Sequence, residues 1–443
     1  MKKSVLFALV VFAMLSFSLL SLDLKFVDRI DGKVKGNRFG TMISSVGDVN
    51  GDGYTDFAVA APGSYTVKKQ PGEVHIFYGG SSFDNTADLV LKGETGSDLF
   101  GSSITPMGDF DSDGFDDFAI SAPRNDGTYT DAGKVYIYKG GEKPDTKAYL
   151  SLTGERANDW FGISIAGGKD INGDNQPDLL IGASYAGSNY SGAVYVFLGG
   201  GDFGNPDLKI EGERPGDNFG QVVCIPGDIT GDKINDFIVS ASYNDAGGVK
   251  NAGAVYIYKG GSVISKKPMI TLTGDNVDEN YGYSIDGAGD VNGDGIDDFI
   301  VGSLGGGSNN EGAAMVYTGG KVIRDKPFMR MIGQNPKDMT GRVVSNAGDI
   351  NNDGFADIMV GSPYSDIGFY RNGRVDVYLG GKEADIISDY HILGEKADAQ
   401  CGFYIERVPN FFGKKGRNND LYIVNCAGKE SGFSDISSIL LYK

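Results

Sequence analysis

The sequence predicts an all-β fold, a seven-bladed β-propeller whose blades are four-stranded antiparallel sheets. Three observations support this fold. A Phe-Gly-like pair recurs every 58–62 residues, a Gly-Gly pair follows it in the first six repeats, and an aspartate-rich cluster lies between the two in each of those repeats. Repeats of this length with four short strands are typical of propeller blades. Solenoid repeats, the alternative architecture, are shorter, at about 20–45 residues.

Two glycine markers define the repeats. The Phe-Gly-like pairs are Phe39-Gly40, Phe100-Gly101, Phe161-Gly162, Phe219-Gly220, Tyr281-Gly282, Thr340-Gly341 and Cys401-Gly402. The Gly-Gly pairs are at 79–80, 140–141, 199–200, 260–261, 319–320 and 380–381. Within the second repeat, the stretches 102–104, 117–123, 133–138 and 148–152 are short and rich in β-branched and aromatic residues, so each is expected to be a strand.

The two ends of the chain are expected to close the ring. The seventh repeat stops at Ser438–Lys443, which corresponds to a third strand, so its fourth strand is missing. Leu22–Phe26 resembles the fourth strand at Pro206–Ile210 and is predicted to supply the missing one. Because this pairing removes the open edge between the first and last blades, residues 22–443 are expected to form one closed propeller domain.

An apolar N-terminal segment predicts export. Met1-Lys2-Lys3 precedes a continuous run of apolar and small residues at 5–20, so residues 1–21 are expected to be a signal peptide or an N-terminal anchor. No later run approaches the length of a membrane span. The remainder of the chain is therefore expected to be secreted, periplasmic or on the cell surface.

Charge and composition exclude several classes. The formal net charge of −19 argues against nucleic acid and against an anionic membrane surface as partners. Three Cys and two His argue against Cys/His zinc sites and a His-based catalytic triad. Cys401 and Cys426 lie on neighbouring predicted strands of the seventh repeat, so a disulfide between them is a hypothesis that export permits. Cys224 is expected to be a buried thiol.

Six repeats carry an aspartate cluster that predicts calcium binding. It begins eight residues after the glycine of the Phe-Gly-like pair and has Asp, Asn or, once, Thr at positions 1, 3, 5 and 9. Oxygens at positions 1, 3 and 5 can surround one cation when a glycine at position 6 permits a sharp turn, and position 7 adds its backbone carbonyl. This donor set predicts up to six Ca²⁺ sites. The candidate ligands are Asp48, Asn50, Asp52, Tyr54, Asp56, Asp109, Asp111, Asp113, Phe115, Asp117, Asp170, Asn172, Asp174, Gln176, Asp178, Asp228, Thr230, Asp232, Ile234, Asp236, Asp290, Asn292, Asp294, Ile296, Asp298, Asp349, Asn351, Asp353, Phe355 and Asp357.

The loops differ in their donors. The second has four carboxylates, whereas the fourth has Thr230 and Lys233 at positions 3 and 6. The seventh repeat has Asn410 where the cluster should begin, and it is predicted to have lost the site. An EF-hand is excluded because position 12 lies inside a β run, as at Val59. A metal-free Asx turn is the alternative, but a turn needs no group of mutually repelling carboxylates.

The chain resembles the FG-GAP repeats of the integrin α N-terminal β-propeller over residues 22–443. The resemblance rests on the Phe-Gly pair, the Asp-x-Asn/Asp-x-Asp-Gly-x-x-Asp loop, and the pairs Ala61-Pro62, Ala122-Pro123 and Ser362-Pro363. It implies calcium loops on a lower face and ligand contacts on an upper face. Similar repeats occur in exported prokaryotic proteins, which the Met-Lys-Lys start resembles.

Aromatic residues in the loops between second and third strands predict a binding rim opposite the calcium loops. They are Tyr65, Tyr129, Tyr185, Tyr190, Tyr243, Tyr364, Phe369 and Tyr370. The expected function is a non-enzymatic binding or adhesion module for a protein partner. The alternatives are a carbohydrate-binding lectin and a propeller glycosidase or lyase. The glycosidase alternative needs an acid/base carboxylate pair, and the sequence supplies no distinct pair outside the calcium clusters.

Overall fold

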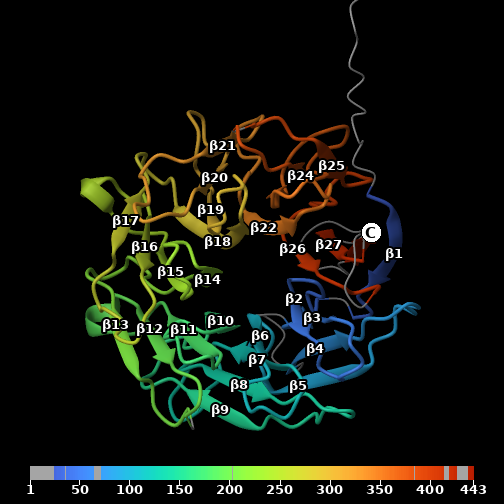
Figure 1. Cartoon of the computed structure of the whole chain (residues 1–443), viewed down its shortest axis with the longest axis vertical. Coiled ribbons are helices and arrows are strands. Elements are labelled where there is room, and N and C mark those ends of the chain that lie inside the picture. Colours follow the sequence, from blue (N-terminus) through green and yellow to red (C-terminus); the bar gives the residue numbers. More distant parts are fainter. Residues whose placement is uncertain are drawn as a thin grey trace, which may run out of the picture.

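Seven four-stranded antiparallel sheets form a closed ring, as the sequence predicts (Figure 1). The structure, a computed structural model, describes residues 24–34, 36–63, 71–201, 203–383, 385–413, 419–426 and 438–443. The predicted signal segment 1–21 and the rim residue Tyr65 lie outside these ranges. Two short 3₁₀ turns, η1 (Ser188–Tyr190) and η2 (Ala246–Gly248), are the only helices in the described part of the chain, and neither could cross a membrane.

Each blade runs from an inner strand at the centre of the ring to an outer strand at its edge. Blade one contains β2 (Met42–Gly47), β3 (Asp56–Ala61), β4 (Pro71–Phe77) and β5 (Leu89–Gly96), and blade two contains β6 (Ile104–Gly108), β7 (Asp117–Ala122), β8 (Lys134–Tyr138) and β9 (Leu150–Thr153). Blade three contains β10 (Ser164–Lys169), β11 (Asp178–Ala183), β12 (Ala193–Phe197) and β13 (Leu208–Glu211), and blade four contains β14 (Val223–Gly227), β15 (Asp236–Ala241), β16 (Ala254–Tyr258) and β17 (Ile270–Thr273). Blade five contains β18 (Tyr281–Gly289), β19 (Asp298–Ser303), β20 (Ala313–Tyr317) and β21 (Met329–Ile332), and blade six contains β22 (Val343–Gly348), β23 (Asp357–Ser362), β24 (Arg374–Tyr378) and β25 (Tyr390–Leu393). Blade seven contains β26 (Ile405–Val408), β27 (Leu421–Cys426), β28 (Ser438–Tyr442) and the N-terminal strand β1 (Phe26–Asp31).

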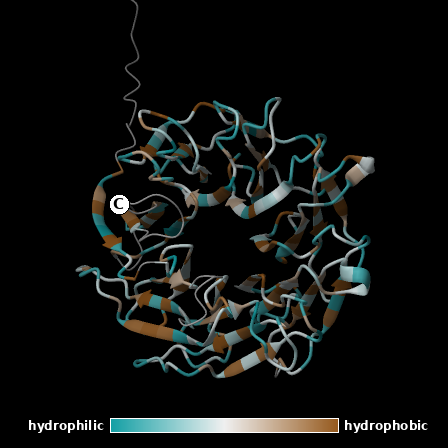
Figure 2. Ribbon diagram, turned by 180° about the vertical axis from the view of Figure 1, so that it is seen from behind, coloured by the Kyte–Doolittle hydropathy of each residue, from teal (hydrophilic) through white to brown (hydrophobic). Residues whose placement is uncertain are grey.

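The hydrophobic core lies between the blades. The second strand of every blade is buried along its whole length, as in β3 and β7, because the neighbouring blades cover both of its faces. After the aspartate that begins six of them, these strands are therefore mostly apolar, whereas the outer strand β9 alternates between buried or half-buried and exposed residues. Seven apolar clusters form, one for each pair of adjacent blades. The apolar residues accordingly concentrate in the strands (Figure 2).

The Phe-Gly pair lies at or just before the start of each inner strand and packs against the preceding blade. Gly101 has a φ of +93°, and its N–H donates to the Ser121 carbonyl oxygen of its own blade (2.8 Å). A Cβ atom at Gly101 would lie 2.8 Å from the Cβ of Ala60 in blade one. Phe100 is fully buried in the cluster between these two blades. Both the backbone conformation and the close approach therefore require glycine here.

An N-terminal strand completes blade seven, but the predicted bounds were wrong. The strand is Phe26–Asp31, not Leu22–Phe26, and it pairs antiparallel with β28 from Phe26 opposite Tyr442 to Asp31 opposite Ser438. A bulge between Phe26 and Asp28 shifts the register. Prediction from alternation alone selected the wrong stretch because Ile30, which lies beyond that stretch, is the residue that packs between blades seven and one.

The disulfide hypothesis is confirmed. Cys401 and Cys426 are bonded, and their Cα atoms are 4.1 Å apart. The bond joins the Phe-Gly-like position of blade seven to the end of β27. Cys224 is a free and buried thiol, as expected.

The inner strands enclose a polar channel of about 680 Å³ along the axis of the ring. The fourth residue after the Phe-Gly glycine reaches the next blade in several repeats. Thr105 Oγ1 accepts a hydrogen bond from the Gly167 N–H (3.0 Å), Asp286 Oδ2 from the Asn346 N–H (3.1 Å), and Glu406 Oε1 from the Ser45 N–H (2.9 Å). A hydroxyl therefore makes the same contact between blades as these two carboxylates do.

The seam between β1 and β28 can be tested by cross-linking. Lys25 and Lys443 exchange both backbone hydrogen bonds (2.9 Å each), so the adjacent Phe26–Tyr442 pair is a non-hydrogen-bonded pair, in which side chains approach most closely. We expect Phe26→Cys/Tyr442→Cys to form a disulfide in the folded protein, detected by its mobility without reductant. Phe26→Cys/Ser438→Cys, at opposite ends of the seam, is the control and should stay reduced. A free thiol pair at 26 and 442 in folded protein would contradict the seam.

Glu406 predicts a pH dependence of stability. Enclosure in the channel, reinforced by the charge of Asp286, raises the pKa of Glu406 to about 8. Because the pKa is higher in the folded protein than in the unfolded chain, the stability that Glu406 contributes is present at acid pH and is lost as the pH rises through about 8. We expect the free energy of unfolding, measured with denaturant in Ca²⁺, to fall less between pH 6 and pH 9 in Glu406→Gln than in the wild type. An equal decrease in the free energy of unfolding of the two proteins would contradict the raised pKa of Glu406.

Candidate metal-binding loops and the upper face

The six aspartate clusters form the loops between the first and second strands of blades one to six, as between β2 and β3. Because strand direction alternates within a blade, all six loops lie on one face of the ring, which we call the lower face. The loops between second and third strands and the connections between blades lie on the opposite, upper face. The two faces predicted from the sequence are therefore separate in the structure.

The six loops share one conformation. The carboxylate at position 1 accepts a hydrogen bond from the backbone N–H of position 6, as from Gly53 to Asp48 Oδ2 (2.7 Å) and from Gly295 to Asp290 Oδ2 (2.8 Å). The carboxylate at position 5 accepts one from the N–H of position 7, as from Tyr54 to Asp52 Oδ1 (2.9 Å). The same pair of bonds recurs in the other four loops. These bonds hold the carboxylates at positions 1 and 5 against the backbone of the loop.

Two positions of each loop have left-handed backbone, and the sequence analysis identified only one. Position 6 has a positive φ in all six loops, as expected for its glycines, but Lys233 holds a φ of +75° in the fourth loop. Position 4 is also left-handed, with φ of +74° at Gly51 and +62° at Ser112. A side chain at positive φ is strained. The fourth loop therefore carries a conformational cost at Lys233 that loops with glycine at position 6 avoid.

The aspartate at position 9 is fully buried in every loop. Asp56 Oδ2 accepts a hydrogen bond from the Val49 N–H (3.0 Å), and Asp56 Oδ1 accepts one from the Gly79 N–H (2.8 Å). The equivalent pair of backbone bonds holds Asp117, Asp178, Asp298 and Asp357. Asp236 accepts from the position 3 N–H of Thr230 (2.9 Å) and from Gly260 (2.9 Å). Each of these carboxylates therefore ties the loop, the second strand and the Gly-Gly turn of its blade together.

Negative charge is unfavourable at these buried positions. Burial, reinforced by the carboxylates of Asp52 and Asp48 and opposed by the two backbone hydrogen bonds, raises the pKa of Asp56 to about 8. The same causes raise the pKa of Asp298 to about 7 and that of Asp178 to about 6. A cation bound in the loop would lower these pKa values by favouring the ionised carboxylates.

Three carboxylates converge in the second loop. One oxygen from each of Asp109, Asp111 and Asp117 lies within 4.8 Å of the others. A lysine also reaches this loop, because Lys139 Nζ pairs with Asp111 Oδ2. In the fourth loop Lys259 Nζ lies 2.9 Å from Asp232 Oδ2. Among the described residues, the carboxylates of loops one, three, five and six have no such ion pair.

Blade seven puts an arginine beside the corresponding carboxylate. Asp420 directly precedes β27, near the place that Asp56 takes as the first residue of β3, and its Oδ1 accepts the Asn410 N–H (2.9 Å). Its Oδ2 lies 2.7 Å from Arg407 Nε. The sequence analysis missed Asp420 because this loop is two residues longer than the others. An aspartate directly before the buried run at 421–426 was the signal for it.

Neighbouring lower-face loops are also bonded to each other. Asp116 Oδ2, at position 8 of the second loop, accepts the N–H of Asp48 in the first (2.8 Å), and Asp297 Oδ2 accepts the N–H of Asp228 (3.1 Å). The second glycine of a Gly-Gly pair adds a bond to the preceding blade, as from Gly141 to the Val49 carbonyl oxygen (2.9 Å). The conformation of one loop therefore affects the next.

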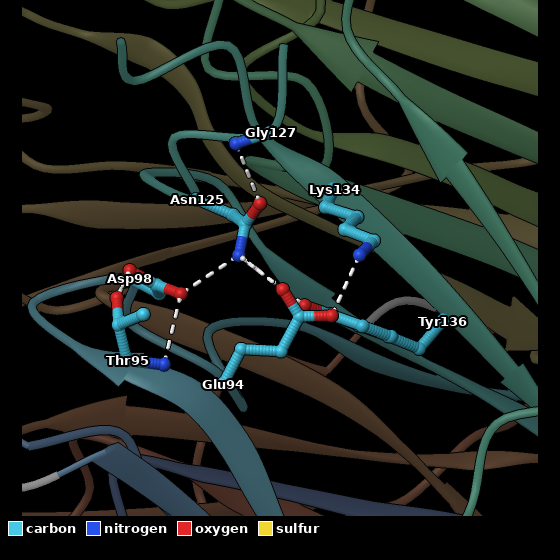
Figure 3. Close-up of polar contacts among 7 residues, drawn as sticks. All are labelled: Glu94, Thr95, Asp98, Asn125, Gly127, Lys134 and Tyr136. Atoms are coloured by element: carbon cyan, nitrogen blue, oxygen red, sulfur yellow. Dashed lines mark hydrogen bonds and ion pairs between the residues drawn. The ribbon is translucent and has the colours of Figure 1, made fainter. Parts of the chain in front are cut away.

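A second set of buried acidic residues, also missed from the sequence, orders the upper face. Asp98 lies three residues before Gly101 and accepts a hydrogen bond from the Asn125 side chain (2.7 Å), which also approaches Glu94 and Tyr136 (Figure 3). Lys134 pairs with Glu94 in the same network (2.6 Å). The equivalent buried residues are Asp159, Asp217, Glu279 and Asp338. An acidic residue three positions before the Phe-Gly glycine was the available signal.

The predicted rim aromatics are mostly exposed on the upper face. The exposed fraction is 64% for Tyr190, 58% for Tyr370 and 53% for Phe369. Tyr129, Tyr185 and Tyr243 are also exposed, whereas Tyr364 is half-buried against Phe403. Asp286 and Glu406, which the sequence analysis did not identify, provide carboxylates in the channel but are engaged by backbone N–H groups.

Comparison with known proteins identifies the repeats. The FG-GAP repeat model matches residues 41–77, 100–138, 161–197 and 340–378, which lie in blades one, two, three and six. The chain is 34% identical over 173 residues to integrin alpha-5 of Xenopus laevis, a match that covers 36% of this chain and 16% of the relative. It is 36% identical over 169 residues to integrin alpha-3 of Cricetulus griseus, covering 36% of this chain and 15% of the relative.

These matches span less than one-fifth of the length of the relatives. They agree with the strand order, the Phe-Gly glycine and the repeated aspartate loops described above. The chain carries FG-GAP repeats and folds as an integrin-α-like FG-GAP β-propeller.

Proposed function

We propose that this protein is an exported, calcium-stabilised binding module, with one Ca²⁺ in each of six lower-face loops and a protein partner on the upper face. The sixfold recurrence of one oxygen-rich loop around a buried carboxylate supports the calcium sites most directly. In blade seven the equivalent carboxylate is neutralised by Arg407 instead. We infer that each blade needs a positive charge beside this carboxylate, which Arg407 supplies in blade seven and Ca²⁺ supplies in the other six.

The donors suit Ca²⁺. Side chains at positions 1, 3, 5 and 9 offer carboxylate, amide or hydroxyl oxygens, and the position 7 carbonyl completes the set. Ca²⁺ accepts about six to eight oxygen ligands at flexible geometry, whereas Mg²⁺ demands a stricter octahedron and retains water. We expect Lys139 and Lys259 to leave their carboxylates when the metal binds. The loss of this ion pair reduces the net free energy of Ca²⁺ binding in both loops.

The binding role is supported by the exposed upper-face aromatics and by the integrin α resemblance. A disulfide between Cys401 and Cys426 fits an oxidising compartment outside the cytoplasm. We propose no catalytic role, because Asp286 and Glu406 make the contact between blades that Thr105 makes with a hydroxyl. A lectin remains the competing binding function, and a glycan array separates it from a protein-binding module.

Removal of metal should destabilise the fold. At roughly 10⁻⁴–10⁻³ M affinity per site, as in extracellular modules, 10 mM Ca²⁺ stabilises the folded state by about 1–3 kcal/mol for each occupied loop. We expect EDTA to lower the melting temperature in differential scanning calorimetry. Added Ca²⁺ should restore it more than equimolar Mg²⁺. A melting curve that is identical in EDTA and in Ca²⁺ would refute the calcium sites.

The loops should contribute unequally. Asp113→Ala removes one of four carboxylates from the second loop, whereas Asp232→Ala acts on a loop with Thr230 at position 3 and strain at Lys233. We expect Asp113→Ala to lower the melting temperature in Ca²⁺ more than Asp232→Ala. The difference should shrink in EDTA, where neither loop holds metal. The same difference with and without Ca²⁺ would mean that it does not arise from metal binding.

A further inference from the structure

Two arginines and five aromatic residues form a continuous strip on the upper face of blades five to seven, which we call the arginine strip. Its members are Tyr283, Arg342, Tyr364, Tyr370, Arg371, Phe403 and Tyr404. Arg371 Cζ lies 5.1 Å from the ring centroids of both Tyr364 and Tyr370. The rings of Tyr364 and Phe403 are 5.6 Å apart, and Arg342 Cζ lies 5.4 Å above Phe403. The strip therefore runs without interruption from one arginine to the other.

The strip joins the rim to the channel. Tyr364, Tyr370 and Arg371 belong to the loop between β23 and β24, on the upper face. Arg342 directly follows Gly341 at the start of the inner strand, so it lies at the upper end of the channel. Arg342 lines that cavity together with Tyr283 and Tyr404, whose ring centroids lie 4.8 and 5.8 Å from its Cζ. A partner segment crossing the rim of blade six could therefore contact both arginines.

Neither guanidinium of the strip pairs with a carboxylate among the described residues. By contrast, Arg124 pairs with Asp131 (3.1 Å) and Arg407 pairs with Asp420 (2.7 Å). Asp366, beside the strip, accepts a hydrogen bond from the backbone N–H of Arg371 (2.5 Å) and is not its ion-pair partner. The channel wall also contains the Thr41 hydroxyl, which is buried and has no hydrogen-bond partner. The N–H groups of Arg342 and Arg371 are therefore not engaged by a carboxylate of the described residues.

We propose that the arginine strip binds an acidic segment of the protein partner, with carboxylates paired to Arg342 and Arg371. This inference rests on the proposed function and gives the chemistry of its ligand. Stacking on the rings fixes each guanidinium while its N–H groups remain available, and this arrangement suits bidentate carboxylate recognition. Arginine and tyrosine are also the residues that contribute most to protein interfaces.

An acidic peptide fits the strip better than a polysaccharide does. A sugar stacks on an open ring face, whereas the guanidinium of Arg371 stands over the rings of Tyr364 and Tyr370. A long nucleic acid is disfavoured because its phosphates would extend beyond the strip, over the surface of a molecule of net charge −19. A short acidic peptide would contact the two guanidinium groups of the strip. Salt screens its repulsion by aspartates that lie more than about 8–10 Å away.

The test uses a fluorescein-labelled peptide of alternating Glu and Gly residues, with fluorescence anisotropy in Ca²⁺ buffer. We expect saturable binding that weakens with salt, and at least about tenfold weaker binding by Arg342→Gln/Arg371→Gln. Arg324→Gln is the matched control because Arg324 is an exposed arginine on the lower-face connection between β20 and β21. A peptide of alternating Gln and Gly controls for charge. The single variant Arg371→Gln, in an exposed loop, should also weaken binding and serves if the double variant fails to fold.

Three outcomes would overturn the inference: no binding of the acidic peptide to the wild type, equal binding by Arg371→Gln, or tighter binding of polygalacturonate than of the peptide. The calcium dependence of melting is a separate readout of the proposed function. Failure of peptide binding with calcium dependence intact would therefore refute only the ligand chemistry. Peptide binding without any calcium dependence would refute only the calcium sites.

Discussion

One buried carboxylate at the start of the second strand organises each blade. Asp56 and its five equivalents accept backbone hydrogen bonds from the loop and from the Gly-Gly turn, so three segments of the blade meet at one ionisable group. Burial makes its charge costly, and the neighbouring loop carboxylates add to the cost. A positive charge nearby offsets this cost. Blade seven supplies that charge covalently with Arg407, and we attribute the same role to Ca²⁺ in the other six.

The charge on one buried carboxylate affects the neighbouring blades as well, because adjacent loops are hydrogen-bonded to each other. Asp116 and Asp297 bond to the preceding loop, and Gly-Gly turns bond to the preceding blade, so the lower face is a connected belt of polar contacts. The N-terminal strand and the Cys401–Cys426 bond close the seventh blade, which lacks the aspartate loop. On the upper face, Asp98 and its equivalents and backbone bonds such as Trp160 N–H to the Asp131 carbonyl oxygen (3.3 Å) hold the bases of the loops. These loops differ in length and sequence and carry exposed aromatics, which leaves them available for a partner.

Structural features that depend on a local sequence pattern could be predicted from the sequence. The spacing of the Phe-Gly glycines predicted seven blades, and the positions of Cys401 and Cys426 on adjacent strands predicted their bond. Features that depend on contacts between blades could not be predicted. Glu406 bonds Ser45, which is 361 residues away, and the Asp116 bond to Asp48 spans 68 residues. The bounds of β1 were misplaced for the same reason, because Ile30 is fixed by packing between the last and first blades. Asp420 was missed because two inserted residues moved it out of the expected spacing.

The central claim is that the six loops, and not the seventh, bind Ca²⁺. A crystal structure of the protein grown in Ca²⁺ and refined with an anomalous difference map tests it most directly. The account predicts six peaks, each enclosed by the position 1, 3, 5 and 9 side chains of one loop, with Lys139 and Lys259 turned away and no peak beside Asp420. Lower-face loops that hold only water, with both lysines still paired to Asp111 and Asp232, would contradict it.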